Sequence, residues 1–234
     1  MFARALFAAF IVSLLAGSSQ AADVAWLRKM NQKFPASETK VRLFDTQTLD
    51  GWQGQKDKYW TVQNAAIIGK NTAENAPKAS TYLVTDKPYK NFRLIFESKL
   101  VESEMHSGIA FWGNTVEMES DPFSYKGHLV MYPSKYGFFD LYGRRSVYLD
   151  KDGVAQAAGK QHDWNRMEIL AIAPRIRHVI NGKLVADWTD PLPETCVPGP
   201  IGLQLHSNKV AQEVQWKGLL LSENPEDVLI SVED

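Results

Sequence analysis

Three histidines lie in or beside segments of alternating sequence, which can bring their side chains to one surface. They are His106, His128 and His206. Imidazole titrates near neutral pH, and its neutral form is a common metal ligand. Two of these histidines together with Asp140 would therefore form an acid–base set or bind a divalent metal. An isolated histidine is more often a polar surface group, and spacing alone leaves both interpretations open.

Three carboxylates, Glu117, Glu119 and Asp121, are spaced two residues apart. On a strand they would share one face, with neighbouring Cα atoms about 7 Å apart. Retaining glycoside hydrolysis needs two carboxyl groups about 5–5.5 Å apart, so the spacing allows a catalytic pair. Because Ser120, Asp121 and Pro122 favour a turn, a solvated strand end is the preferred interpretation.

Two other polar features have simple interpretations. Asp150, Asp152 and Gly153 resemble the start of a calcium-binding loop, but the distal glutamate is missing and a turn is expected. Cys196 lies in a loop and has no neighbour in the sequence that would lower its pKa, so it is expected to be an inert thiol. A single cysteine excludes an internal disulfide and a cluster of several thiolates.

The composition is that of a globular protein without a strong charge bias. The chain has 234 residues, of which 44% are hydrophobic and 23% charged, with 26 basic against 27 acidic residues. Proteins that coat nucleic acid or anionic membranes usually carry a large positive excess, so neither is expected as a partner. The sequence lacks a glycine-rich phosphate loop, H-E-x-x-H and G-x-S-x-G, which disfavours nucleotide, zincin and serine-esterase functions.

Residues 1–21 have the order of features of a signal peptide. Arg4 is followed by an apolar run, Ala5–Ala16, and then by small residues at Ser19 and Ala21. This order predicts export to the periplasm or beyond the cell, with cleavage near Ala21. No later stretch reaches about 18 uninterrupted apolar residues, so no transmembrane segment is expected in the mature chain.

Residues 22–40 are expected to form a short N-terminal helix and a linker. Val24, Leu27, Met30 and Phe34 recur there at helical spacing. The acidic residues 223–234 are expected to form a loose C-terminal tail.

Between these ends, residues 41–222 alternate in hydrophobicity with a period of two. The candidate strands are 41–44, 59–63, 66–69, 81–85, 92–101, 108–113, 127–132, 137–142, 164–172, 175–180, 183–188, 201–206 and 214–221. Asn181–Gly182 predicts a tight hairpin, because both residues tolerate positive φ. Many short strands without a long helix predict an all-β domain, an antiparallel two-sheet β-sandwich of the jelly-roll kind.

Alternation also assigns residues of the late strands to faces. Ile201, Leu203 and Leu205 are expected to face the core, so Gln204 and His206 face the other way. By the same argument Asp140, Tyr142 and Arg144 lie opposite Phe139 and Leu141. A sheet face that presents such side chains is either solvated or a binding groove, and the aromatic content favours a groove for sugar rings.

The order of short motifs along the chain resembles the 3-keto-disaccharide hydrolase domain family. The matching stretches are Leu43–Asp45, Leu49–Trp52, Tyr59–Val62, Phe92–Glu97, His106–Phe111, Leu141–Gly143, Asp163–Asn165, Asn181–Gly182 and Gly199–His206. The resemblance implies a concanavalin A-like jelly roll with its ligand on the concave face. It also implies cleavage of 3-keto-glycosides, in which the C3 ketone acidifies the C2 proton, so that a base can remove it and the C1 substituent can leave.

The match to that family is uneven at the positions that would carry the chemistry. His206 and Gln204 match the late strand of the family, and Tyr142 matches its Leu-Tyr-Gly. The family often has Arg where this chain has Trp112, and Glu and Gln around Leu129 and Met131. Those polar groups are absent here, whereas His128, Asp140, Arg144 and Arg145 are present.

The resulting hypothesis assigns a role to each candidate. His206 is expected to be the base or a metal ligand with His128 and Asp140 beside it, and Arg144 and Tyr142 stabilise the developing oxyanion. Trp112 is expected to stack on the sugar ring, with Gln204 and Glu119 as further substrate contacts. A divalent metal is a candidate cofactor, and a monomer or small homo-oligomer is expected. The alternatives are a non-catalytic carbohydrate-binding module and a protein-interaction scaffold.

Overall fold

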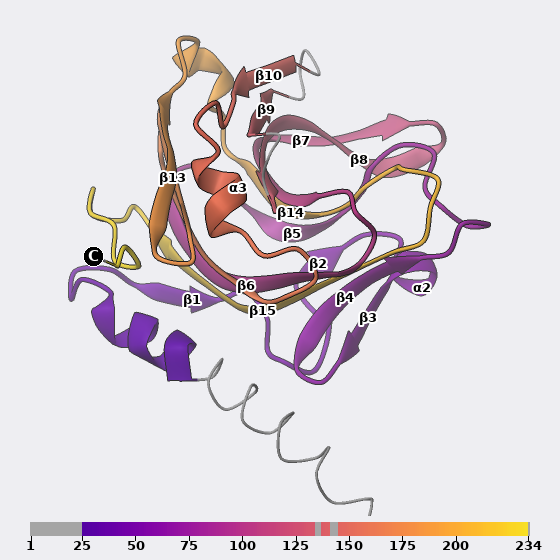
Figure 1. Ribbon diagram of the computed structural model, residues 1–234, viewed down its shortest axis with the longest axis horizontal. Coiled ribbons are helices and arrows are strands. Elements are labelled where there is room, and N and C mark those ends of the chain that lie inside the picture. Colours follow the sequence, from indigo (N-terminus) through magenta and orange to yellow (C-terminus); the bar gives the residue numbers. More distant parts are fainter. Residues whose placement is uncertain (1–24, 134–136, 141–144, 234) are drawn as a thin grey trace, which may run out of the picture.

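The computed structural model describes residues 25–133, 137–140 and 145–233, and in this part of the chain two antiparallel sheets pack face to face (Figure 1). In the first sheet the strand order is β13-β12-β11-β6-β15-β4-β3, with β1 paired to β15. In the second sheet it is β10-β9-β8-β7-β14-β5-β2. The prediction of an all-β sandwich with a short N-terminal helix is therefore confirmed.

The strands of the first sheet are β1 (Lys40–Arg42), β3 (Trp60–Gln63), β4 (Ala66–Asn71), β6 (Phe92–Glu102), β11 (Asn165–Ile172), β12 (Arg175–Ile180), β13 (Lys183–Thr189) and β15 (Gln212–Glu223). Those of the second sheet are β2 (Trp52–Gln53), β5 (Thr81–Tyr89), β7 (Ser107–Met118), β8 (Asp121–Tyr132), β9 (Phe138–Asp140), β10 (Arg145–Tyr148) and β14 (Gly199–Leu205). Short helical segments are α2 (Lys56–Tyr59), α3 (Val154–Ala158) and the 3-10 turn η1 (Pro193–Thr195), and residues 25–33 form the N-terminal helix.

The core lies between the sheets, where alternate residues of both meet. The rings of Phe92 on β6 and Phe111 on β7 cross edge to face, with centroids 5.3 Å apart. The indole Nε1 of Trp216 on β15 donates a hydrogen bond to the Tyr132 hydroxyl on β8. Each such side chain contributes about 1.5–3 kcal/mol through burial alone, so these cross-sheet contacts hold the two layers together.

Two tight turns illustrate how local sequence sets strand register. At the predicted hairpin, Ile180 pairs with Lys183, and Asn181 and Gly182 have φ of 48° and 85°. Glu119 and Ser120 adopt φ of 50° and 64° between β7 and β8. Positive φ at both central residues is the type I′ geometry of two-residue hairpins. The interpretation of the carboxylate cluster as a solvated strand end holds for Glu117 and Glu119, which are exposed, whereas Asp121 is buried and accepts a hydrogen bond from the Phe123 backbone.

The C-terminal segment is anchored on the outer face of the first sheet, so the expectation of a loose tail is wrong. The backbone N–H groups of Ile230 and Ser231 and the Ser231 hydroxyl donate to the buried carboxylate of Glu168. Glu168 also pairs with Arg93, which in turn binds the Glu38 carboxylate through two hydrogen bonds. A sequence pattern could not reveal these contacts, since they join positions far apart in the chain.

The N-terminal helix covers the same face of the first sheet (Figure 1). Trp26, Met30 and Phe34 are buried there against Ile95 and Ile230. Of the residues noted at helical spacing, Met30 and Phe34 are buried and Leu27 is partly buried, whereas Val24 lies outside the described residues and Trp26 was not anticipated. Among the described residues, no helix has the length and apolar character needed to span a bilayer.

Candidate functional site

The strand register defines rows of side chains on the outer face of the second sheet, which points away from the core. In one row Gly202 on β14 pairs with Ala110 on β7 and Val84 on β5, and Ala110 pairs with Leu129 on β8. We call the side chains on this side of the second sheet the outer-face rows. This first row is made entirely of small and apolar residues.

In the next row Gln204 pairs with Tyr82, and Gly108 pairs with Met131. Gln204 and Tyr82 are buried, and the amide Nε2 of Gln204 donates to the Tyr82 hydroxyl at 3.1 Å. The Oε1 atom of Gln204 is buried and has no hydrogen-bond partner among the described residues. A buried acceptor of this kind costs free energy, and a ligand hydroxyl would satisfy it.

One row further on, His206 follows the end of β14 and His106 precedes β7. Their ring centroids are 4.4 Å apart and the rings meet edge to face. His106 is buried, and burial, with a further contribution from His206, lowers its pKa to about 3. His106 is therefore neutral at physiological pH, beside the partly exposed imidazole of His206. The sequence analysis singled out both histidines but did not foresee their direct contact.

His206 and Gln204 lie on the outer face of the second sheet, where alternation predicts them. None of the row positions described above carries a carboxylate. Leu129 and Met131, where the resembling family often carries Glu and Gln, are buried beside Tyr82 and Val84. The polar part of the face is consequently confined to the end that carries the two histidines. Tyr82 was not anticipated, although alternation along 81–85 places it opposite Leu83.

His128 is not part of this end of the sheet. It faces the core, where Nε2 lies 2.5 Å from Oδ2 of Asp190 and the ring lies near those of Trp112 and Trp188. Phe111, the register partner of His128, is five residues from His106 along the chain, about 17 Å at ~3.3 Å per residue. Hydrogen-bonded groups need separations near 3 Å, so His128 and His206 do not form one constellation and that expectation is wrong.

The remaining predicted site residues are dispersed. Trp112 is fully buried, with its indole Nε1 bound to the Lys90 carbonyl at 2.6 Å, so it offers no face for stacking on a sugar. Glu119 is exposed in the β7–β8 turn. The backbone of Asp140 pairs with that of His128 across β8 and β9. Tyr142 and Arg144 lie outside the described residues.

Cys196 is buried next to Asp190, and the two positions belong to the connection between β13 and β14. Burial and the neighbouring Asp190 carboxylate raise the pKa of the Cys196 thiol to about 12. A thiol in this state is a poor nucleophile, in keeping with the inert cysteine that the sequence predicts.

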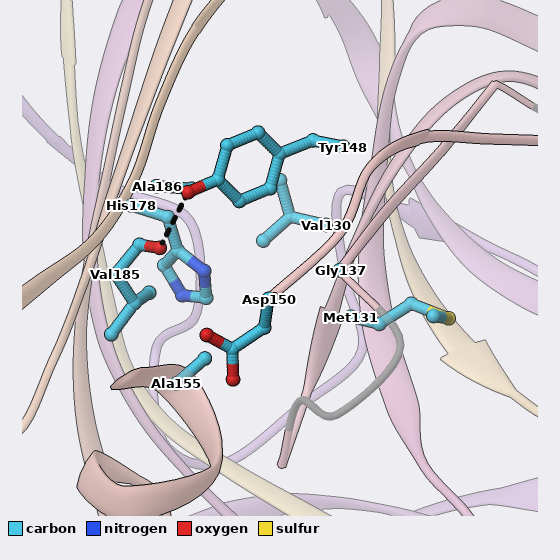
Figure 2. Close-up of a pocket in the computed structure, with 9 residues that line it drawn as sticks. All are labelled: Val130, Met131, Gly137, Tyr148, Asp150, Ala155, His178, Val185 and Ala186. Atoms are coloured by element: carbon cyan, nitrogen blue, oxygen red, sulfur yellow. Dashed lines mark hydrogen bonds between the residues drawn. The ribbon is translucent and has the colours of Figure 1, made fainter. Parts of the chain in front are cut away.

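A further histidine, His178 on β12, lines a small pocket between the sheets (Figure 2). Burial lowers its pKa to about 3, and the pocket has a volume of about 10 Å³, room for about one water molecule. Asp150 points toward this pocket and accepts a hydrogen bond from the Gln156 backbone, as a turn residue before α3. The space is too small for a sugar.

The fold and the outer-face rows define a jelly-roll protein with a polar cluster at one end of its second sheet. The profile of the 3-keto-alpha-glucoside-1,2-lyase-like domain family matches residues 39–221, and the chain belongs to that family. Membership supports a carbohydrate-related function. Among curated proteins, none matches this chain.

Several solved structures share the fold. Two are candidate glycosyl hydrolases from Parabacteroides distasonis, each 17% identical in sequence. The first has a TM-score of 0.53 and the match covers 79% of this chain and 93% of that one. For the second, the TM-score is 0.52 and the coverages are 78% and 98%. A third structure, from work on endo-acting O-glycanases of human gut bacteria, is 9% identical with a TM-score of 0.50 and covers 81% of this chain and 94% of its own. At these identities the likeness shows the fold alone.

Proposed function

We propose that this protein is an exported carbohydrate-active enzyme that cleaves 3-keto-glycosides, with His206 as the catalytic base. The observation that supports this most directly is the contact between the imidazoles of His106 and His206, one row from the buried acceptor of Gln204. Family membership supplies the substrate class. The signal-peptide pattern of residues 1–21 supports export to the periplasm or the medium.

The chemistry that such a site must perform begins with removal of a proton from C2 of the sugar. The C3 ketone makes this proton acidic, and the electron pair released from the C2–H bond forms an enolate. Collapse of the enolate expels the C1 substituent as its alcohol after protonation, leaving a C1–C2 double bond. Water then adds across that bond, so the net reaction is hydrolysis. A histidine base contributes about 10²–10⁴-fold to a proton transfer of this kind.

The histidine pair suits the first step because its two members differ. His106 remains neutral, since its pKa lies near 3. A second positive charge 4.4 Å away is unfavourable, so a proton taken from the substrate is held on the more exposed His206. His106 is thereby a positioning residue, which packs against the base and restricts its orientation.

Gln204 and Tyr82 suit the task of holding the sugar. Gln204 and Tyr82 are only 2% and 1% exposed, so the side chains above them must move before a sugar reaches them. The free lone pairs of Gln204 Oε1 would then accept a hydroxyl proton from the ring, and the Tyr82 hydroxyl is held in place by the amide of the same glutamine. Donors held in this way stabilise the oxygen on which negative charge develops. Gly108 and Gly202 let neighbouring side chains pack closely, since a Cβ at Gly108 would lie 2.7 Å from Leu129 Cδ1 and one at Gly202 would lie 3.1 Å from Tyr82 Cδ1.

The alternative is a carbohydrate-binding module without turnover. It is supported by the outer-face rows themselves, in which Leu129, Met131, Val84 and Ala110 fill the positions next to Gln204 with apolar groups. These four side chains are buried and place no second acid or base next to Gln204, and sugar binding alone needs no base.

The decisive experiment uses the purified protein and a panel of 3-keto-glucosides, with and without added divalent cations. Release of the aglycone is expected from wild type, with a loss of at least about 100-fold in His206→Gln. His162→Gln is the control for a nearby histidine outside the outer-face rows, because His162 is exposed and binds Glu104, two residues before His106. No turnover by wild type on the whole panel would refute the enzyme; binding of the same sugars that persists in His206→Gln without product would establish the module instead.

A further inference from the structure

Three side chains with different donor atoms converge in the core, where the connection between β13 and β14 meets β8. They are the imidazole of His128, the carboxylate of Asp190 and the thiol of Cys196, and one ligand atom of each lies within 4.8 Å of the others. His128 Nε2 is 2.5 Å from Asp190 Oδ2, and the Cys196 Sγ is 3.9 Å from the same oxygen. All three residues are buried. The Nδ1 atom of His128 is buried without a hydrogen-bond partner among the described residues.

The three residues come from both layers of the sandwich. His128 lies on β8 of the second sheet, Asp190 directly follows β13 of the first, and Cys196 precedes β14 of the second. Between Asp190 and Cys196 the chain forms the turn η1, in which Asp190 Oδ1 accepts a hydrogen bond from the Leu192 backbone. An ion bound by all three groups would therefore link the two sheets and fix the β13–β14 connection.

We propose that His128, Asp190 and Cys196 bind Zn²⁺ and that the ion cross-links the two sheets. The proposal is independent of the carbohydrate site, which lies at the start of β7, five residues from Phe111, the register partner of His128. Zinc accepts nitrogen, oxygen and sulfur ligands together, whereas calcium and magnesium select oxygen alone. Carboxylate and thiolate together carry two negative charges, so a bound Zn²⁺ makes the cluster neutral, as burial requires.

The observed positions need little adjustment to accept the ion. In a tetrahedral site with metal–ligand distances of about 2.0–2.3 Å, neighbouring ligand atoms lie about 3.3–3.6 Å apart. The nitrogen–oxygen pair must separate from 2.5 Å, and the sulfur–oxygen pair must close slightly from 3.9 Å. These two shifts are below about 1 Å, and the nitrogen–sulfur pair, which lies within 4.8 Å, must close by at most about 1.2 Å, so small side-chain rotations suffice. A water molecule or the Thr195 hydroxyl, which is 3.1 Å from Asp190 Oδ2, would supply the fourth ligand.

The experiment measures metal binding by the full chain after dialysis against a chelator. Elemental analysis after incubation with Zn²⁺ and desalting is expected to find about one zinc per chain. With Co²⁺ as a spectroscopic substitute, the protein should show the thiolate-to-cobalt charge-transfer absorption and the d–d bands of a tetrahedral site. Because Cys196 is the only cysteine, that absorption can arise from no other residue.

Variants identify the ligands. Cys196→Ala and His128→Gln should each weaken Zn²⁺ binding by more than about 100-fold, since even outer-shell substitutions at zinc sites cost 10- to 100-fold. His162→Gln, an exposed histidine elsewhere, should bind as wild type does. Zinc should raise the melting temperature of wild type and of His162→Gln, and leave that of Cys196→Ala unchanged.

Two results would overturn the proposal. One is a wild-type protein that retains no zinc and gives no thiolate–cobalt band, which would leave a hydrogen-bonded cluster only. The other is zinc binding of wild-type strength in Cys196→Ala, which would place the ion elsewhere. The cobalt spectrum of wild type decides the matter even if a substitution in the core prevents folding.

Discussion

The buried ion network on the outer face of the first sheet allows a quantitative test of how the chain ends are held. Glu168 is fully buried and is the acceptor for three donors of the C-terminal segment as well as for Arg93. We consider the substitution Glu168→Ala. It removes one member of a buried ion pair and leaves the donors of Ile230 and Ser231 without their acceptor.

The expected cost is about 3–5 kcal/mol in the free energy of unfolding, the usual penalty for removing one partner of a buried pair. Arg93 retains Glu38 and the carbonyls of Glu226 and Val228, which keeps the loss from being larger. The matched control is Lys87→Ala, which breaks a pair with Glu223 in which the two side chains are 59% and 36% exposed. Surface pairs contribute about 0–1 kcal/mol, so the control should be mild.

Urea denaturation of both variants, followed by tryptophan fluorescence, measures the difference. Hydrogen exchange at the Ile230 and Ser231 amides should also rise in Glu168→Ala, because the segment loses its anchor. The reasoning is refuted if the two variants lose stability equally, or if the two amides stay protected. Equal losses would mean that Arg93 and the backbone hold the segment without the carboxylate.

Three further predictions follow from single residues. Burial lowers the pKa of His178 from 6.5 to about 3, so between these pH values the unfolded chain binds a proton that the folded chain does not. The free energy of unfolding should therefore decrease as the pH drops from about 6.5 toward 3, by up to about 1.4 kcal/mol per pH unit. Thermal melts of His178→Asn should show a weaker dependence of stability on pH. Arg93 holds the pKa of Glu38 below its usual value of 4.5. The stability that this pair contributes is therefore present above pH 4.5 and is lost as the pH falls through the lowered pKa. In acid denaturation, Glu38→Gln should accordingly show a flatter dependence of stability on pH below 4.5 than wild type does. Gly182→Ala should lower the free energy of unfolding by about 1–3 kcal/mol, because φ is 85° and a Cβ would lie 2.9 Å from the Cβ of Glu233. Gly153→Ala, with φ of 70° and open space around it, should lower it by about 1 kcal/mol. Equal losses of the two variants in urea denaturation would show that the contact with Glu233 does not matter.

Local sequence was sufficient to predict those parts of the fold that local chemistry decides. The hairpin at Asn181–Gly182 and the strand 175–180 are found as expected, because turn residues and alternation act over a few positions. The short strand β10 and the pairing of β6 with β15 were not predicted, since they depend on partners distant in the chain. The tail was misjudged for the same reason: its acidic composition gives no sign of Arg93 beneath it.

For the candidate site, the sequence could not predict which face of a strand points into the core when both faces are apolar. In His128–Tyr132 every position after the histidine is apolar or aromatic, so alternation does not tell which face is inner. The structure puts Val130 and Tyr132 in the core and Leu129 and Met131 outside, which turns His128 inward. The register shift of β7 between Phe111 and Asn114, with Trp112 at φ of 50°, brings two consecutive aromatic side chains into the core. A bulge of this kind breaks alternation and removes Trp112 from the face on which it was expected.

The separation of the histidines into two groups means that the two proposals can fail independently. His106 and His206 meet on the outer face of the second sheet, and His128 meets Asp190 and Cys196 in the core about 17 Å away along β7. Cys196→Ala should therefore lose zinc and keep cleaving 3-keto-glycosides below its melting temperature. His206→Gln should lose cleavage and keep zinc. If either substitution abolished both properties in a folded protein, the ion and the sugar would share one site, which the strand register does not allow.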